Sequence, residues 1–341
     1  MVDFLQPYLD DIWLAHMWFF LLYYAISDGL DLGVGILSLF SRSTTEVGIL
    51  MGSIRGSWHG NQTWLVILAG MLFGAFPLFY AVVFSALYIP LLLMLFGLVL
   101  RGVAFEFRDH SRRKRLWARS FGWGSLIIAA SQGLGFGALI SGAITVEKGV
   151  YSGGPWAWFN PFSALFAVGV VVGFAMLGSN YLILKTVGGL QEKSRRISRL
   201  TSAIVLCISA GTHIWSLFRF PYIAEKWTVI PWNLLLGGLT FLAVLSFGSI
   251  LLGLRKRWEI APAFFNALVI VFSFSALSVG FYPYMIPWTP EGGIKVSEAA
   301  AAPESLMFML YFSIVALPVI IVYTSYEYWN FRGKTSQSPE Q

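Results

Sequence analysis

Cysteine is almost absent from this chain, and its scarcity excludes several classes of redox site. The single cysteine, Cys207, lies within an apolar run. One thiol cannot form an internal disulfide, a CxxC redox pair, a CxxCH haem attachment or a cysteine-ligated iron–sulfur cluster. The sequence also lacks a Walker motif, a nucleophile elbow and a metal-ligand cluster. We therefore expect no metal site and no autonomous catalysis in this chain.

Charged residues are scarce as well, since 12% of the 341 residues are charged and 57% are apolar. The charged share is about half of that in a soluble domain. So few charges cannot cover a globule of this size, whereas a surface that faces lipid needs none. The 14 Trp and 14 Tyr suit the headgroup level of a bilayer. The composition predicts an integral membrane protein, and the net charge of +6 does not indicate binding to nucleic acid.

Nine apolar runs have the roughly 20 residues needed to cross a bilayer core of about 30 Å. They lie at about 13–38, 52–74, 77–103, 120–143, 161–188, 197–219, 232–254, 260–282 and 305–331. Pro77 is expected to begin the third helix after a tight connection, because proline is tolerated at a helix start. We expect an all-α membrane protein in which residues 1–331 form one transmembrane domain and residues 332–341 form a short polar tail.

The distribution of basic residues predicts the orientation in the membrane. The loops after the third, fifth and seventh runs carry most of them, at Arg108, Arg112, Arg113, Lys114, Arg115, Arg119, Lys193, Arg195, Arg196, Arg199, Arg255, Lys256 and Arg257. The alternate loops hold only Lys148, Arg219, Lys226 and Lys295. The positive-inside rule then places the C-terminus and the short tail in the cytoplasm and the N-terminus outside. Asp3, Asp10 and Asp11 precede the first run without any Lys or Arg, which is unlike a signal peptide, so the first helix is expected to be retained.

Two of the apolar runs contain polar residues at membrane depth. Asp28 and Asp31 lie three residues apart on one helical face. In the next run Arg55, His59 and Gln62 form a polar stripe at i, i+4 and i+7, and this stripe is flanked by Trp58, Asn61 and Trp64. From a rise of 1.5 Å per residue, Asp31 and His59 lie about 10 and 11 Å from the cytoplasmic end, and Asp28 and Gln62 both lie about 15 Å from it. Both helices thus place polar groups in one layer.

Three functions are open to this layer. The first is proton conduction, because histidine exchanges protons near neutral pH. The second is structural pairing between helices, for instance of Arg55 with Asp31, with Gly29 and Gly33 forming a GxxxG contact. The third is binding of an ion or substrate. An intrinsic haem held by two of His16, His59, His110 and His213 is the remaining alternative, and only His16 and His213 come near a common depth.

Four ordered motifs resemble subunit II of the cytochrome bd quinol oxidase family, and most closely its cyanide-insensitive branch. The motifs are SDGLDLGVG (27–35), WHGNQTW (58–64), GAFPLFY (74–80) and SALYIPLLLMLFGLVLRGVAFEFR (85–108). The resemblance implies nine helices arranged as two four-helix bundles plus one peripheral helix. It also implies a partner, subunit I, that holds haems b and d, oxidises quinol and reduces oxygen to water, so that the complex is electrogenic without pumping protons. In some members subunit II holds a structural quinone, and a small single-helix subunit joins the complex.

The resemblance also implies roles for individual residues. Asp28 and Asp31 match the acidic pair of the first helix, and Arg101 with Glu106 matches the basic–acidic end of the third. The family usually has WDGNE or WDGNQ where this chain has His59, so an imidazole stands at the position of an acid linked to the proton route. We expect a proton path through Asp28, Asp31, His59, Gln62, Arg101 and Glu106, with Arg55, Trp58, Asn61 and Trp64 in structural pairing.

The sequence thus predicts a non-haem subunit of a quinol oxidase in the bacterial inner membrane. This subunit stabilises subunit I, contacts lipid and contributes a cytoplasmic proton path, and it is not catalytic alone. The alternative is a proton- or cation-coupled secondary transporter, which would need broken helices at corresponding positions of two repeats. The glycine-rich stretch at 29–35 has no such counterpart in the second half of the chain.

Overall fold

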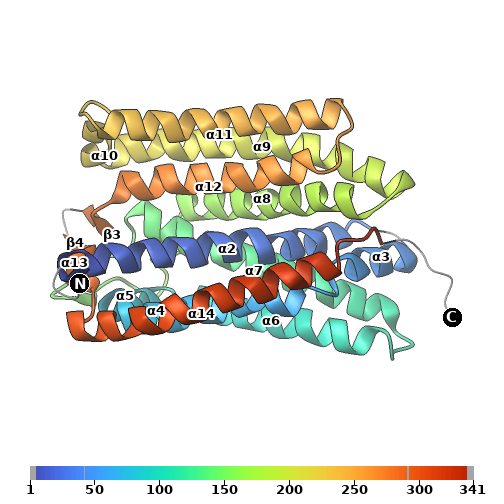
Figure 1. Ribbon diagram of the computed structural model, residues 1–341, viewed down its shortest axis with the longest axis horizontal. Helices are drawn as coiled ribbons and strands as arrows, with labels where there is room; N and C mark the ends of the chain where they lie inside the picture. Colours follow the sequence, from blue (N-terminus) through green and yellow to red (C-terminus); the bar gives the residue numbers. More distant parts are fainter. Residues whose placement is uncertain (1–4, 42, 290–291, 336–341) are drawn as a thin grey trace.

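Two four-helix bundles lie side by side in the computed structural model, which describes residues 5–41, 43–289 and 292–335 (Figure 1). The first bundle contains α2 (Leu9–Ser38), α4 (Trp58–Ala75), α6 (Tyr88–Arg108) and α7 (Lys114–Ser141). The second contains α8 (Pro161–Lys185), α9 (Gly188–Arg219), α11 (Trp232–Arg255) and α12 (Ala261–Phe281). A ninth long helix, α14 (Pro303–Asn330), runs outside the first bundle along α2 and α4.

Short elements connect these helices at both ends of the bundles. They are η1 (Gln6–Tyr8), α3 (Thr44–Ile54), α5 (Pro77–Ala86), α10 (Pro221–Lys226), α13 (Val296–Ala299) and two antiparallel hairpins, β1 (Val146–Glu147) with β2 (Val150–Tyr151) and β3 (Tyr284–Thr289) with β4 (Gly292–Lys295). Within the described residues, eight helices are individually long and apolar enough to cross a membrane, and the bent pair of α4 and α5 raises the number to as many as nine. This confirms the predicted all-α membrane fold of two bundles and one peripheral helix.

We call the end of the bundles that carries the loops α6–α7, α8–α9 and α11–α12 the basic end. Figure 1 shows it on the right, together with α3 and the end of α14. The orientation predicted from the basic loops assigns this end to the cytoplasm. The other end carries both hairpins, α5, α10 and α13.

The second and third predicted helices differ from those observed. The run at 52–74 is interrupted at Arg55–Ser57, so α3 ends and α4 begins there. The run at 77–103 is broken at Leu87 and continues to Arg108. Pro90 explains the second break, because proline has no N–H to donate to the carbonyl four residues earlier, that of Ala86. α4 and α5 are bent by 119° relative to each other where Pro77 begins α5.

Other helix ends extend past the apolar runs. α7 begins at Lys114 and α9 at Gly188, rather than at 120 and 197, because polar first turns continue both helices beyond the membrane. Residues 332–335 of the predicted tail are described, whereas 336–341 lie outside the described residues.

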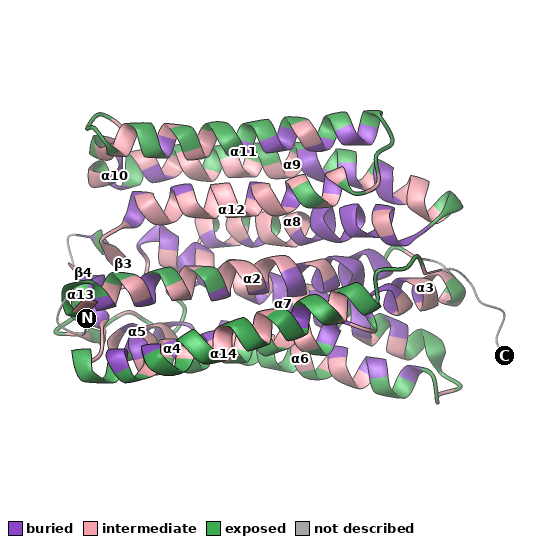
Figure 2. Cartoon of the chain, in the orientation of Figure 1, coloured by how far each residue is buried: buried purple, intermediate pink, exposed green. Residues whose placement is uncertain are grey.

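The two bundles approach each other most closely through glycines. A Cβ on Gly33 of α2 would lie 1.9 Å from the carbonyl oxygen of Phe174 and 2.7 Å from the backbone nitrogen of Gly178, both on α8. A Cβ on Gly178 would in turn lie 2.5 Å from the backbone of Gly33. The predicted close approach at Gly29 and Gly33 is therefore confirmed, and α2 is held between both bundles. Figure 2 shows buried residues concentrated where α2, α7 and α8 meet, whereas α11 and α14 are largely exposed.

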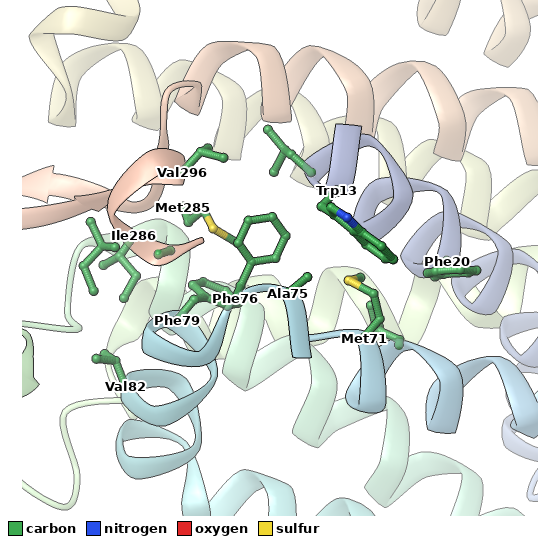
Figure 3. Close-up of a cluster of buried hydrophobic side chains, with 14 of the residues drawn as sticks. Trp13, Phe20, Met71, Ala75, Phe76, Phe79, Val82, Met285, Ile286 and Val296 are labelled. Atoms are coloured by element: carbon green, nitrogen blue, oxygen red, sulfur yellow. The ribbon is translucent and has the colours of Figure 1, made fainter. Parts of the chain in front are cut away.

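Residues 282–289 and 292–302 cap the end opposite to the basic end. The β3–β4 hairpin and α13 pack on the turn between α4 and α5, and Figure 3 shows Phe76 and Phe79 beside Met285 and Ile286. Trp13 of α2 donates a hydrogen bond from its indole nitrogen to the carbonyl of Leu306, 3.0 Å away. This cluster joins α2, the α4–α5 turn and the start of α14.

The C-terminal segment ties α14 to the second bundle at the basic end. The Lys185 ammonium donates to the carbonyls of Phe331 and Gly333, and Thr335 donates its backbone N–H to the carbonyl of Lys185 at 2.8 Å. The Phe331 ring occupies the space beside Gly56, where a Cβ would lie 2.3 Å from it. The residue at the break between α3 and α4 therefore has to be small.

Candidate functional site

The first bundle contains a line of buried polar side chains along α2. Tyr24, Asp28 and Asp31 follow one another at spacings of four and three, so they point to one side of the helix. All three are buried: Asp28 is 0% exposed and Asp31 is 1% exposed. Ionisable groups at this depth are costly unless protein or water compensates for them. The helices α4, α6, α7 and α14 supply the partners, as described below.

Asp28 forms a fully buried ion pair with Arg101 of α6. Their nearest atoms, Asp28 Oδ1 and Arg101 Nη2, are 2.5 Å apart, and both side chains are 0% exposed. Asp28 Oδ2 and the Nε and Nη1 atoms of Arg101 have no hydrogen-bond partner among the described residues. Buried polar atoms in native proteins are nearly always paired, so this group of atoms is an unusual feature of the structure.

Asp31 is connected to α14 through a chain of neutral hydrogen bonds. The Tyr328 hydroxyl donates to Asn61 Oδ1 at 2.9 Å, and Asn61 Nδ2 donates to Asp31 Oδ2 at 2.9 Å. Asn61 is completely buried. Asp31 is also close enough to Arg101 for the two to interact electrostatically. The three helices α2, α4 and α14 therefore meet in one polar cluster with the Asp28–Arg101 pair.

Glu327 of α14 directly precedes Tyr328 of this cluster. It is half-buried, and its Oε2 atom is buried with no partner among the described residues. It faces Gly60 of α4, where a Cβ would lie 2.3 Å from Oε2. Glycine at position 60 thus provides the room for this carboxyl group. The sequence analysis missed Glu327, although it follows a run from 305 to 326 that contains no charged residue.

The polar line continues one helical turn deeper than Asp28. Gln132 of α7 lies 2.5 Å from the Tyr24 hydroxyl through its Nε2 atom, and the same atom lies 3.8 Å from the Met94 sulfur of α6. Sequence analysis also missed this pair, because a tyrosine and a glutamine in apolar helices are ordinary residues until the fold brings them together.

The structure separates the remaining predicted residues from this line. His59 and Glu106 are exposed. The centroid of the His59 ring lies 3.7 Å from that of the neighbouring Trp58 ring, with the two planes tilted by 33°. Gln62 is half-buried, and its Nε2 atom has no partner among the described residues. Of the predicted path, Asp28, Asp31 and Arg101 come together. Within the described residues, no side-chain hydrogen bond or ion pair joins His59, Gln62 or Glu106 to them.

Arg55 does not belong to a continuous stripe with His59 and Gln62, because the chain leaves the helical path between Arg55 and Trp58. It also does not pair with Asp31. Its guanidinium lies 2.5 Å from the carboxylate of Asp109, and both side chains are exposed. The suggested pairing of Arg55 with Asp31 is therefore wrong. Arg55 instead forms its ion pair at the surface of the basic end.

The surroundings of Asp109 set its protonation behaviour. Partial burial acts to raise the pKa of its carboxyl, but the hydrogen bond and charge of Arg55, with the charges of Arg108 and Lys114, outweigh that effect and lower the pKa. Arg108 also donates to the backbone carbonyl of Thr44 at 2.9 Å. This cluster holds α3 against the end of α6.

Trp58 and Trp64 pack in the core of the first bundle. Trp58 stacks on Phe105 of α6, with ring centroids 4.6 Å apart and planes 8° apart. Trp64 is 0% exposed, and its ring lies 4.0 Å from that of Tyr23 on α2. Both rings join α4 to a neighbouring helix.

Cofactor ligands do not converge in the described part of the chain. No group of three or more His, Cys, Asp or Glu side chains is placed there to hold a metal ion. His16 lies on α2, where its ring is 2.8 Å from the carbonyl of Ile12, and His213 lies on α9 beside Trp227. The two residues belong to different bundles. The buried charges of the first bundle form an ion pair without a histidine or cysteine, so this site does not fit a haem.

Comparisons with known proteins indicate one family over nearly the whole chain. The family model described as cytochrome bd terminal oxidase subunit II matches residues 9–331. The chain is 27% identical to cytochrome bd-I ubiquinol oxidase subunit 2 of Escherichia coli, covering 96% of this chain and 95% of that protein. It is 25% identical to cytochrome bd ubiquinol oxidase subunit 2 of Bacillus subtilis, covering 96% and 97%. A chain in the structure of bd oxidase from Geobacillus thermodenitrificans superposes with a TM-score of 0.75 at 18% identity, covering 95% and 99%.

Proposed function

Since this chain belongs to the family of cytochrome bd terminal oxidase subunit II, we propose that it serves its oxidase as a non-haem subunit that carries protons from the basic end toward the haem-bearing partner. The chain is a multi-pass protein of the bacterial inner membrane, in a complex that transfers electrons from quinol to oxygen. Subunit I is its partner and contains the haems. A small single-helix subunit and a structural quinone are further components that we propose only from the resemblance.

The observation that carries this proposal is the buried polar line that starts at the basic end. Hydrogen bonds join Tyr328, Asn61 and Asp31, the Asp28–Arg101 pair lies beside Asp31, and Glu327 directly precedes Tyr328 in α14. A purely structural ion pair would not need a connection of hydrogen-bonding groups to one surface. The reduction of oxygen consumes protons, and a complex that is electrogenic without pumping, as the family resemblance implies, has to take them from the cytoplasm.

The residues of the line have distinct tasks in this mechanism. Carboxylates can bind and release a proton, so Glu327, Asp31 and Asp28 are the proposed carriers. Asn61 has both a donor and an acceptor, and it orients Asp31 by donating to it while accepting from Tyr328. Arg101 remains charged, and its guanidinium holds the Asp28 carboxyl group in place through their ion pair.

His59 lies outside this line, and we propose that Glu327 supplies the carboxyl group at its entrance. Glu327 faces Gly60, the residue directly after His59. A carboxyl group on α14 therefore lies beside the position where the family usually carries an acid on α4. In this proposal Gln62 and Glu106 face the partner and do not carry protons in sequence with Asp31.

We further propose that subunit I covers the outer face of α4 and α6. This face exposes His59, Thr63 and Glu106, and polar side chains of this kind are costly against lipid. A partner on this face also lies next to the end of the polar line at Asp28. The transporter alternative is not favoured, because the relatives from Escherichia coli and Bacillus subtilis are oxidase subunits.

The test is the variant Asp31→Asn, which keeps the shape of the side chain and removes its charge. The tagged complex is purified from its native membrane in mild detergent, and reduced-minus-oxidised spectra and quinol-driven oxygen consumption are measured. We expect normal haem content and a loss of turnover of about 100-fold, at the lower end of the effect of removing a proton-transfer group.

The matched control is Glu46→Gln, which removes one carboxylate from a surface ion pair with Lys193 at the same end of the bundles. It should leave turnover unchanged, because exposed pairs contribute little. Normal turnover of Asp31→Asn with normal haem content would refute the proton path. Haem spectra in the purified chain without its partner would refute the non-haem assignment.

A further inference from the structure

A groove lies between α9 and α11 at the basic end, far from the polar line of the first bundle. It has a volume of about 440 Å³ and is lined by Arg199, Leu251 and Arg255. Figure 1 shows α9 and α11 at the outer edge of the second bundle, on the side away from α14. Figure 2 shows α11 exposed along much of its length. The groove thus opens to the surroundings of the bundle rather than to its interior.

Both arginines lie where the membrane-crossing parts of their helices end. Residues 200–218 of α9 and 232–254 of α11 contain no Asp, Glu, Lys or Arg. Arg199 and Arg255 are the first charged residues after these uncharged runs at the basic end. Lipid headgroups occupy this level of a bilayer, and basic side chains are favoured there.

Neither guanidinium is neutralised by the protein. Among the described residues, Arg199 and Arg255 have no acidic group within ion-pair distance. Other basic residues nearby are engaged: Arg257 pairs with Glu192 at 3.6 Å, and Arg195 donates to two backbone carbonyls. Two unpaired positive charges that line one groove repel each other, and an anion bound between them would offset this repulsion.

The wall of the groove turns apolar toward the membrane. Leu251 precedes Arg255 by four residues, so it lies on the same face about 6 Å deeper. Three residues further, Gly248 leaves open space where a Cβ would be. Leu251 and Gly248 are both exposed on α11, as are Ala203 and Leu206 on α9. A ligand that fits this arrangement has an anionic head and an apolar tail.

We propose that this groove binds an anionic phospholipid, with its phosphodiester group between Arg199 and Arg255. The planar guanidinium matches phosphate oxygens with two parallel hydrogen bonds, which suits a phosphate better than a single point charge would. The acyl chains lie against Leu251 and the open side of Gly248. Inorganic phosphate shares the chemistry of the head but not that of the apolar wall.

The experiment uses the intact, delipidated oxidase complex and phosphatidylglycerol, with phosphatidylcholine of the same acyl chains as the uncharged comparison. Native mass spectrometry gives the dissociation constant of the tightest-bound lipid. We expect phosphatidylglycerol to bind more tightly than phosphatidylcholine. The double variant Arg199→Gln/Arg255→Gln should weaken phosphatidylglycerol binding on the order of 30-fold, as removal of two basic contacts to anionic lipid predicts.

The matched control, Lys256→Gln/Arg257→Gln, removes the same charge from the same end but from residues that do not line the groove. It should leave the dissociation constant unchanged. Arg199→Lys/Arg255→Lys keeps the charge and should show an intermediate loss, and it serves as the test if the glutamine variant does not assemble. Equal binding of both lipids, unchanged binding in the double variant, or displacement of the lipid by millimolar inorganic phosphate would overturn the proposal.

Discussion

The buried ion pair of Asp28 and Arg101 allows its structural and its proton-carrying roles to be separated by a double-mutant cycle. Removing one partner of a buried pair leaves an unpaired charge and costs about 3–5 kcal/mol. Asp31 also interacts with Arg101, so the loss of stability in Asp28→Asn should lie near the lower end of this range. Arg101→Met leaves two buried carboxylates without a cation, so its loss of stability should lie near the upper end.

Removing both partners has a different consequence for stability than for turnover. Replacement of a complete buried pair by uncharged residues is often neutral or stabilising, so Asp28→Asn/Arg101→Met should recover part of the stability lost in Arg101→Met, because only Asp31 is then left without a cation. It cannot recover a proton carrier. We therefore expect the double variant to be more stable than Arg101→Met and to have normal haem content, while its quinol-driven oxygen consumption remains low.

The assay is the apparent melting temperature of the purified complex, followed with haem spectra and oxygen consumption on the same samples. The surface pair of Lys193 and Glu46, 2.6 Å apart and partly exposed, is the control. The double-mutant cycle of this control pair should give a coupling free energy of no more than about 1 kcal/mol. A double variant with full turnover would show that Asp28 only pairs with Arg101. An Asp28→Asn variant as stable as the wild type would refute the reasoning about an unpaired buried arginine.

Three further predictions concern packing, entrance and pH. Gly60→Ala should displace the Glu327 carboxyl group, because Oε2 would lie 2.3 Å from the new methyl group. Both Gly60→Ala and Glu327→Gln should therefore lower turnover. Normal oxygen consumption in both variants would exclude Glu327 as the entrance of the proton path. Gly33→Ala should destabilise the complex by at least about 1–3 kcal/mol through a clash with the α8 backbone, whereas Gly173→Ala on α8, with open space at its Cβ, should have the melting temperature of the wild type. The lowered pKa of Asp109 means that its stabilising effect is complete above the unfolded value, about 3.9, and is lost as the pH falls through the folded value. Asp109→Asn should therefore destabilise the complex at pH 7 but lose that difference in melting temperature below about pH 4; a constant difference across this range would contradict the assignment.

Most long helices were predictable because a bilayer core imposes a minimum length on any apolar run. The runs that became α8, α11, α12 and α14 were predicted to within about two residues of their observed starts, because Pro161, Trp232, Pro262 and Pro303 lie at or beside clear changes in polarity. The break at Leu87 was not predicted. Its cause, Pro90, was visible in the sequence, but hydropathy does not report on the missing hydrogen bond.

The site was predictable only in part. Asp28, Asp31 and Arg101 were identifiable because charges are rare within apolar helices, and the fold brings them together. His59 was placed beside them from its depth alone, and the rotation of α4 turns it outward. Glu327, like Asp28, is an acid that follows a long uncharged run, but it lies close to the C-terminal end of the last helix. The estimated depth of Glu327 in the membrane gave no reason to connect it with helices more than 250 residues earlier in the sequence.

The sequence by itself determined that the chain lies in a membrane, roughly where its long helices run, and that Asp28, Asp31 and Arg101 carry charge at membrane depth. These properties follow from the cost of exposing polar groups to lipid, which acts on each helix separately. Tertiary structure alone decided which charges are partners. Asp28 pairs with Arg101 and Arg55 with Asp109, because pairing depends on how each helix is rotated about its axis. That rotation is set by close contacts between helices, such as those at Gly33 and Gly60, which no single helix contains.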